Sequence, residues 1–279
     1  MNVLRNACDI HTHTIYSRHA YSTIEENVRA AAELRLELLG CTEHFSSMLH
    51  PPVATEDGRL ACDTRDYQYF YNFGCWPRVW HGVRLLHGCE ADIVDLEGNL
   101  FGHDVVVDEG ITGDAESPAT LKDRVFSRCD YVIASVHGRD FARGADLSAT
   151  TKMYLSALQD PKVLVLGHPV RGRVPFEHRE VVRAARDLHK LIEINAHSLD
   201  AVIGRKDTID GCQALAELCA EEGCKIVVSS DAHISCGVGG FDPALRMLER
   251  IHFPQALIAT RDAESFLRAM REGVGTTIE

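Results

Sequence analysis

Short apolar runs alternate with helical patterns along almost the whole chain, and this alternation restricts the possible fold more than any other feature. The runs are rich in Val, Ile and Leu, as is typical of parallel strands buried on both faces. Seven are clear: residues 7–10, 38–42, 84–89, 131–136, 163–167, 191–195 and 225–229; a weaker candidate is 256–259. Repeated strand–helix units predict an α/β protein with helices around a parallel sheet, closed as a barrel.

The ends of two helices can also be read from the sequence. Ser22 followed by Glu25 has the spacing of a capping box, and Gly223 suits the end of a helix. With 279 residues and no evident linker, the chain has the size of one barrel domain spanning 1–279. Two long connections, about 45–64 and 96–118, are predicted to be insertions, and the glycines of the second indicate a hairpin.

Composition excludes several classes of function. The formal charge of −12 is opposite in sign to that of most proteins that bind a phosphate backbone, so we expect no nucleic-acid partner. No run approaches the roughly 20 apolar residues that span a bilayer, and the start lacks a secretory signal. We therefore expect a cytoplasmic protein without a membrane partner; the sequence does not indicate its oligomeric state. The unusual number is 15 histidines, because histidine is the commonest metal ligand.

Histidines and acidic residues stand at nearly every predicted strand end. In a barrel of parallel strands these ends converge on one face, where the chemistry of such folds is found. Imidazole and carboxylate ligands together suit zinc, manganese or iron, and this many ligands would require two or three ions. The candidate metal ligands are His11, His13, His19, His44, Glu90, His137, His168, Asp231 and His233.

These motifs resemble the PHP (polymerase and histidinol phosphatase) superfamily, and in particular its stand-alone bacterial phosphatases. The resemblance covers nearly the whole chain. The matching segments are Asp9-Ile10-His11-Thr12-His13-Thr14, His19-Ala20-Tyr21-Ser22-Thr23, Thr42-Glu43-His44, Trp76-Pro77-Arg78-Val79, Gly88-Cys89-Glu90-Ala91, Ser135-Val136-His137, Gly167-His168-Pro169, Glu193-Ile194-Asn195 and Ser230-Asp231-Ala232-His233.

The resemblance implies a distorted (βα)7 barrel that holds three divalent ions. It implies a first ion on His11, His13, Glu90 and Asp231, a second on Glu90, His137 and His168, and a third on His19, His44 and His233. It also implies hydrolysis of a small phosphorylated metabolite by a hydroxide that bridges two ions and attacks phosphorus. Glu90, Asp231 and His233 are then the expected catalytic residues.

Arginines near these motifs are candidates for binding the substrate, because a guanidinium matches two phosphate oxygens. The candidate substrate-binding residues are Arg18, Arg139, Arg171, Arg173 and His197. Histidinol phosphatases carry a phosphate-contacting arginine in the loop after His168, and Arg173 lies at a similar offset. Asn195 is a candidate to orient a metal ligand.

Several alternatives remain open at this point. Glu43 and the offset of Arg173 favour a histidinol-phosphate phosphatase, whereas the segments 76–79 and 193–195 favour the more general phosphatase branch. An amidohydrolase is disfavoured because no lysine stands at the strand ends that carry Glu90, His137 or His168. Hydrolysis of a phosphodiester or a nucleic-acid end, and a non-enzymatic role in metal buffering, are further alternatives.

Overall fold

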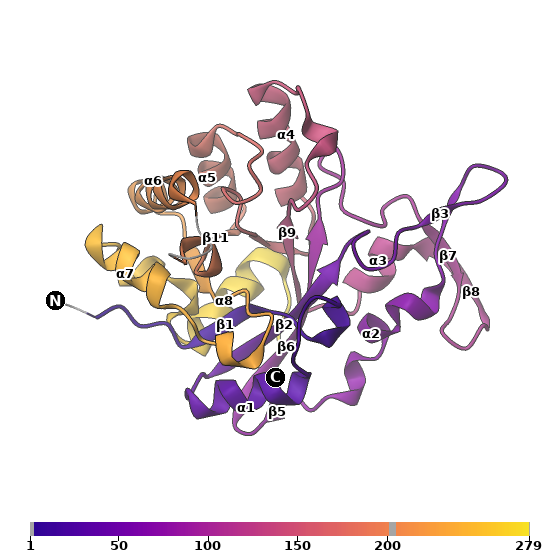
Figure 1. Cartoon of the computed structure of the whole chain (residues 1–279), viewed down its shortest axis with the longest axis horizontal. Coiled ribbons are helices and arrows are strands. Elements are labelled where there is room, and N and C mark those ends of the chain that lie inside the picture. The colour runs from indigo at the N-terminus through magenta and orange to yellow at the C-terminus, as the bar shows by residue number, and fades with distance from the viewer. Residues whose placement is uncertain (1–2, 201–204, 279) are drawn as a thin grey trace.

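The computed structural model describes residues 3–200 and 205–278, and its centre is a nearly closed barrel of parallel strands (Figure 1). Neighbouring strands pair in the order β1-β2-β6-β9-β10-β11-β12, which confirms the predicted α/β barrel. Their bounds are β1 Cys8–Thr12, β2 Leu38–Phe45, β6 Val83–Asp92, β9 Tyr131–Ser135, β10 Val163–Leu166, β11 Leu191–Asn195 and β12 Ile226–Ser229. A short strand, β5 (Val79–Trp80), adds to β6 in the antiparallel sense.

The barrel closes between β1 and β12 by a few contacts rather than by a full ladder. At the carboxyl end, the amide of Asp231 donates to the carbonyl of His11 at 3.0 Å, and the amide of His13 donates to that of Ala232 at 2.9 Å. At the amino end, Thr260 stands between the two strands, with its carbonyl accepting from the amide of Ala7. The weaker predicted strand at 256–259 is wrong: this segment contributes to two 3₁₀ turns and makes a single bridge to β12, because the backbone and side chain of Thr260, rather than a ladder, join it to β1 and β12.

Helices surround the strands, and one helix covers an end of the barrel (Figure 1). The α-helices are α1 Ile24–Glu33, α2 Gln68–Tyr71, α3 Leu121–Phe126, α4 Leu147–Leu158, α5 His178–Asp187, α6 Lys206–Glu222, α7 Asp242–Arg250 and α8 Ala263–Val274. Phe266 and Met270 of α8 belong to one buried cluster with Leu38, Tyr131 and Leu164, which lie at the start of their strands. Helix α8 thus covers the amino-terminal end and leaves the opposite end for the polar residues.

The first helix begins one residue later than predicted. Thr23, not Ser22, is the capping residue, and its backbone amide donates to the Glu26 carboxylate at 2.6 Å. The Ser22 hydroxyl instead accepts from the amide of Ser235 at 2.8 Å, which joins the loop after β1 to the loop after β12. The predicted end of a helix at Gly223 is confirmed, because Gly223 ends α6 in the left-handed conformation.

Both predicted insertions contain two-stranded hairpins, which extend to one side of the barrel in Figure 1. The first holds β3 (Val53–Ala54) and β4 (Leu60–Ala61), and the second holds β7 (Val106–Glu109) and β8 (Ala115–Thr120). None of the helices within residues 3–200 and 205–278 has the length and apolar character needed to cross a membrane.

Candidate metal centre

Strand alternation explains why polar side chains gather at one end of the barrel. Along β6, Leu86, Gly88 and Glu90 share one face, and Leu86 belongs to the buried cluster that contacts α8. The parallel pairing of β2 with β6 places His44 directly beside Glu90. Near the amino-terminal end the interior of the barrel is apolar, and the polar side chains of the cluster lie at the carboxyl ends of the strands or in the loops that follow them.

Glu90 lies at the centre of the polar cluster and is fully buried. Its Oε2 atom is 3.3 Å from Nε2 of His11 and 2.9 Å from Nδ1 of His44. Its Oε1 atom is 2.8 Å from Nε2 of His168 and 3.4 Å from Nε2 of His137. The two oxygens of one carboxylate therefore face two different groups of histidines, as a bridging ligand would.

A second carboxylate, Asp231, faces the two histidines of β1 and its following loop. Its Oδ1 atom is 3.2 Å from Nε2 of His13 and 3.5 Å from Nε2 of His11. The two Nε2 atoms are themselves 3.1 Å apart. These three residues thus meet in space, although they come from opposite ends of the chain.

The remaining histidines form a group nearer to solvent. Nε2 of His19 lies 3.2 Å from Nε2 of His44 and 3.1 Å from Nε2 of His233. All nine predicted ligands are therefore brought together at the carboxyl ends of the strands or in the loops that follow them.

The donor set fits divalent cations. Four groups present converging ligand atoms: His13, His44 and His233; His11, Glu90 and His168; His11, His13 and Asp231; and His44, Glu90 and His137. Within the described residues, Nδ1 of His44 and Oε2 of Glu90 lie 2.9 Å apart, yet neither makes a hydrogen bond of acceptable geometry to the other or to any other group, which is costly unless a cation completes the site.

Neighbouring acceptors fix several imidazole rings so that Nε2 faces the centre. Nδ1 of His11 donates to Oε1 of Glu193 at 2.7 Å, and Nδ1 of His137 donates to Oδ1 of Asp92 at 2.6 Å. Nδ1 of His233 donates to the carbonyl of Asp231 at 2.9 Å. Because an acceptor engages the Nδ1 proton of each ring, Nε2 is the atom that would bind a cation in place of a second proton.

Glu193 and Asp92 were not singled out as site residues from the sequence. Glu193 also accepts from the amide of His168 at 2.7 Å and from the hydroxyl of Ser229. The available signal was the two-residue period, since Asp92 follows Glu90 on β6 and Glu193 precedes Asn195 on β11. Asn195 was predicted to orient a ligand, and its Nδ2 donates to Oδ2 of Asp231 at 3.2 Å.

The charges of the centre are strongly coupled. Burial alone would raise the pKa of Glu90, but His137, His11 and His44 hold it well below its usual value. Burial would lower the pKa of His137, but Glu90 and Asp92 raise it to about 9. Burial, together with the nearby His44, holds the pKa of His13 well below its usual value. The carboxylates thus stay ionised in a buried site, as ligands of a cation must be.

Comparisons with known proteins agree with this geometry. A family model of the PHP domain matches residues 9–199. A protein named a probable phosphatase from Clostridium novyi is 33% identical, over 96% of this chain and 96% of its own length. Another so named, from Caldanaerobacter subterraneus subsp. tengcongensis, is 34% identical over 98% of this chain and 95% of its own length. The chain belongs to the PHP domain family.

A solved structure shows the same fold as this PHP protein. It is the histidinol phosphate phosphatase from Lactococcus lactis, in complex with zinc, L-histidinol and phosphate. The likeness has a TM-score of 0.51 at 16% identity and covers 89% of this chain and 95% of that one. At this identity the comparison supports the barrel and not the details of the site.

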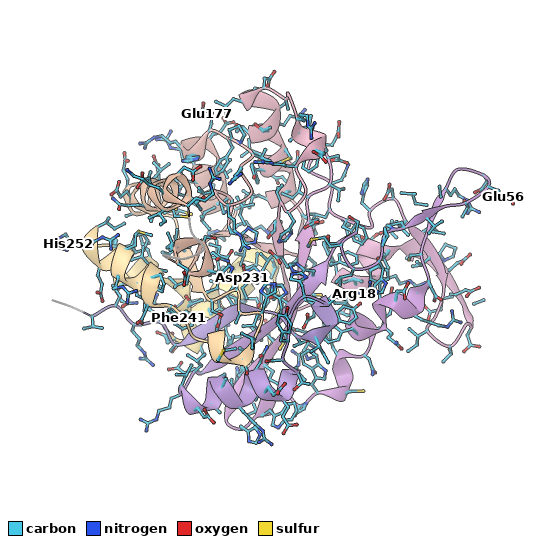
Figure 2. The ribbon with its side chains drawn as sticks, in the orientation of Figure 1. Arg18, Glu56, Glu177, Asp231, Phe241 and His252 are labelled. Carbon is cyan, nitrogen blue, oxygen red and sulfur yellow. The ribbon has the colours of Figure 1, made fainter. Side chains whose placement is uncertain are left out.

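The predicted substrate-binding residues of the PHP protein separate into distinct places. Nη1 of Arg171 donates to Oδ2 of Asp231 at 2.7 Å, and His197 is close enough for the charges of Asp231 and Arg171 to affect its pKa, which burial lowers. Figure 2 shows Asp231 at the centre and Arg18 on the side of the hairpins, where Nη2 of Arg18 lies 3.1 Å from Nδ1 of His50.

The other two arginines lie on the outer side of the site. Arg139 and Arg173 line a hollow that contains none of the nine predicted ligands. Of the two arginines in the loop after His168, it is Arg171 that reaches the metal centre.

Proposed function

We propose that this protein hydrolyses phosphate monoesters of a small metabolite with divalent ions held at this centre. Its membership of the PHP domain family, with relatives named as probable phosphatases, makes it a phosphoester hydrolase. The observation that carries the finer proposal is the position of Glu90, whose two oxygens face different histidine groups at 2.8–3.4 Å.

We assign the ligands as three sets, of which the first two share Glu90. The first set is His11, His13, Glu90 and Asp231, the second is Glu90, His137 and His168, and the third is His19, His44 and His233. Zinc, manganese and iron all suit this mixture of imidazole and carboxylate. Ions of this kind make a bound water nucleophilic at neutral pH and neutralise the negative charge of a phosphate.

The protein's own residues prepare this centre. Glu90 keeps the two groups of histidines that its oxygens face at a fixed separation. Arg171 and Asn195 fix the orientation of Asp231. His233, whose side chain is 23% exposed, lies at the open side, where the substrate would enter. Arg18, next to His19 in the loop after β1, and His197, near Asp231, are the further substrate contacts that we propose.

The structure offers little in favour of histidinol phosphate over other esters. Glu43 accepts hydrogen bonds from the amide of Thr14 at 2.9 Å and from the hydroxyl of Ser17 at 2.6 Å, so it supports the loop after β1. A residue with that role does not select a substrate. Arg173, the second feature that favoured histidinol phosphate, lies in the outer hollow and not against Asp231.

A metal-replacement assay tests the proposal. The protein is dialysed against a chelator, reloaded with zinc, manganese or iron, analysed for metal content, and assayed with p-nitrophenyl phosphate, sugar phosphates and histidinol phosphate. Bis(p-nitrophenyl) phosphate tests the diesterase alternative. We expect monoester hydrolysis that returns with metal. A fully loaded protein that hydrolyses no ester would support metal buffering instead.

A further inference from the structure

A hollow on the outer side of the metal centre gathers three arginines. Its volume is about 330 Å³, and it is lined by Arg139, Asp140, Ala142, Arg143, Arg173, Val174 and Pro175. We call it the outer arginine pocket. Its volume lies at the lower end of the range for ligand sites, which suits a single small group rather than a whole cofactor.

Two loops that carry predicted metal ligands build the outer arginine pocket. Arg139 comes two residues after His137, so its Cα lies within about 7 Å of that of His137. The loop after His168 turns tightly and contacts the first loop through Gly172. A Cβ atom at Gly172 would lie 3.1 Å from the carbonyl oxygen of Val136, so glycine permits this close approach. The two loops that line the pocket are therefore packed against each other directly after His137 and His168.

The charge of the outer arginine pocket is only partly balanced by the protein, through Asp140 in its lining and Asp207 on the other side of Arg173. Among the described residues, Arg143 pairs with Asp140 at 2.6 Å, but both side chains are more than 80% exposed, so the pair is weak. No carboxylate in residues 3–200 and 205–278 forms an ion pair with Arg139 or Arg173. Three arginines against one lining aspartate leave the pocket with an excess of positive charge, which attracts an anion.

The backbone of Arg173 forms a tight turn at the edge of the pocket. Arg173 has a φ of 55°, a left-handed conformation that is unfavourable for a residue with a side chain. Its amide donates to the carbonyl of Val170 at 3.2 Å, which closes the turn. The strained turn places this side chain in the pocket with the other arginines.

We propose that the outer arginine pocket binds a second oxyanionic group of the substrate, a phosphate or a carboxylate, distinct from the phosphate that is hydrolysed. This inference rests on the proposed phosphatase function and narrows its substrate class. The substrate is then a phosphate monoester whose organic part carries a further oxyanion on the side of His137. Arg139 and Arg173 are specificity-determining residues, and Arg171 serves the metal centre.

A series of substrates with matched ends tests the proposal. The kcat/KM values of α,ω-alkanediol bisphosphates with three to six carbons are compared with those of ω-hydroxyalkyl phosphates of equal length. Glycerol 3-phosphate and 3-phosphoglycerate form the carboxylate arm. Hydrogen bonds to a charged group are strong. At one chain length, we therefore expect kcat/KM of the doubly anionic substrate to exceed that of the singly anionic substrate of equal length by at least about tenfold.

Variants assign the preference to the pocket. In the double variant Arg139→Gln/Arg173→Gln, the ratio of kcat/KM for doubly over singly anionic substrates should fall about tenfold or more. Lysine at both positions keeps the charge and should restore part of the ratio. The control is Arg246→Gln on α7, another exposed arginine that pairs with a nearby acid, Asp242 at 3.3 Å. It should leave the ratio unchanged.

Calorimetry gives a readout that does not depend on turnover. Propane-1,3-disulfonate should bind the wild-type protein more tightly than propane-1-sulfonate, and equally tightly in the double variant. A wild-type enzyme that hydrolyses monoesters without preferring doubly anionic ones would overturn the inference and leave the proposed function standing. An equal loss of kcat/KM for doubly and singly anionic substrates in the double variant would also overturn it. No hydrolysis of any ester would overturn the proposed function, and with it the substrate role of the pocket.

Discussion

Nδ1 of His11 and Oε1 of Glu193 lie 2.7 Å apart in the interior of the barrel, where both side chains are completely buried. The same carboxylate accepts from the amide of His168 at 2.7 Å. One glutamate of β11 therefore holds two predicted ligands that come from β1 and from the loop after β10. Burial would raise the pKa of Glu193, but His11 lowers it below its usual value, so the carboxylate stays ionised.

We predict that Glu193→Gln weakens metal binding by about 10- to 100-fold, as loss of an orienting carboxylate does in other metal sites. The amide would accept from His11 with only one oxygen and without a negative charge. Competition titration with a chromogenic chelator measures the change. Glu217→Gln on the exposed face of α6 is the control. Unchanged affinity in Glu193→Gln would show that ring orientation does not depend on this residue.

Glu90→Gln should abolish turnover while the fold survives. The substitution removes the charge that faces both histidine groups, so we expect kcat for a phosphate monoester to fall by at least about 10³-fold. Circular dichroism checks the fold, and Glu97→Gln in the exposed loop after β6 controls for a general effect of losing a carboxylate. Retained activity in Glu90→Gln would count strongly against the proposed centre.

Arg171→Gln should weaken metal binding about tenfold, because Asp231 would keep Asn195 but lose its charged partner. Arg173→Gln, two residues away in the same loop, is a close control, and its metal affinity should equal that of the wild type. Metal content after dialysis at fixed free metal distinguishes the two variants. Equal loss in both would mean that the loop acts as a unit.

The sequence predicted the polar residues of the site better than the lengths of the strands that carry them. Strand β2 was predicted to end at Thr42 and β6 at Cys89, yet they continue to Phe45 and Asp92. His44 and Glu90 look like loop residues because buried strands rarely contain such groups. Both residues remain in the ladder because the imidazole of His44 and the carboxylate of Glu90 face each other at 2.9 Å on neighbouring strands. No local sequence pattern reveals this pairing.

Other features depended on contacts between distant segments. The spacing after His168 could not distinguish Arg171 from Arg173, because the choice depends on a turn in which the amide of Arg171 donates to the carbonyl of His168 at 2.9 Å. In the same way, Ser22 and Thr23 were equally good caps by type. Ser22 was engaged by Ser235, more than 200 residues away.

The interior of the barrel gives a prediction about stability. The hydroxyl of Tyr131 donates to the carbonyl of Ile10 at 2.5 Å, and a Cβ atom at Gly40 would overlap both groups. Gly40→Ala should lower the free energy of unfolding by about 3 kcal/mol, since rigid neighbours cannot move aside. Gly74→Ala, where nothing lies within 4 Å, should leave it unchanged or raise it slightly. Urea unfolding in the presence of a chelator measures both.

His87 predicts how stability depends on pH. Its ring is buried, stacks on Phe73 at a centroid distance of 4.5 Å, and leaves Nε2 without a hydrogen-bond partner among the described residues. Burial, with a smaller contribution from Arg78, lowers the pKa of His87 to about 4. The folded state therefore binds this proton only at a lower pH than the unfolded state, in which the pKa of histidine is near 6.5.

The sign follows from this difference. The contribution of His87 is fully present above pH 6.5 and is lost as the pH falls towards 4. Between pH 7 and pH 4.5, the free energy of unfolding should fall by about 2 kcal/mol less in His87→Phe, which keeps an aromatic ring, than in the wild type. Urea unfolding of the two metal-free proteins at several pH values measures the difference. The histidines predicted to bind metal are present in both proteins, so their titration does not contribute to it. Parallel pH profiles would mean that His87 is as easily protonated in the folded state as in the unfolded chain.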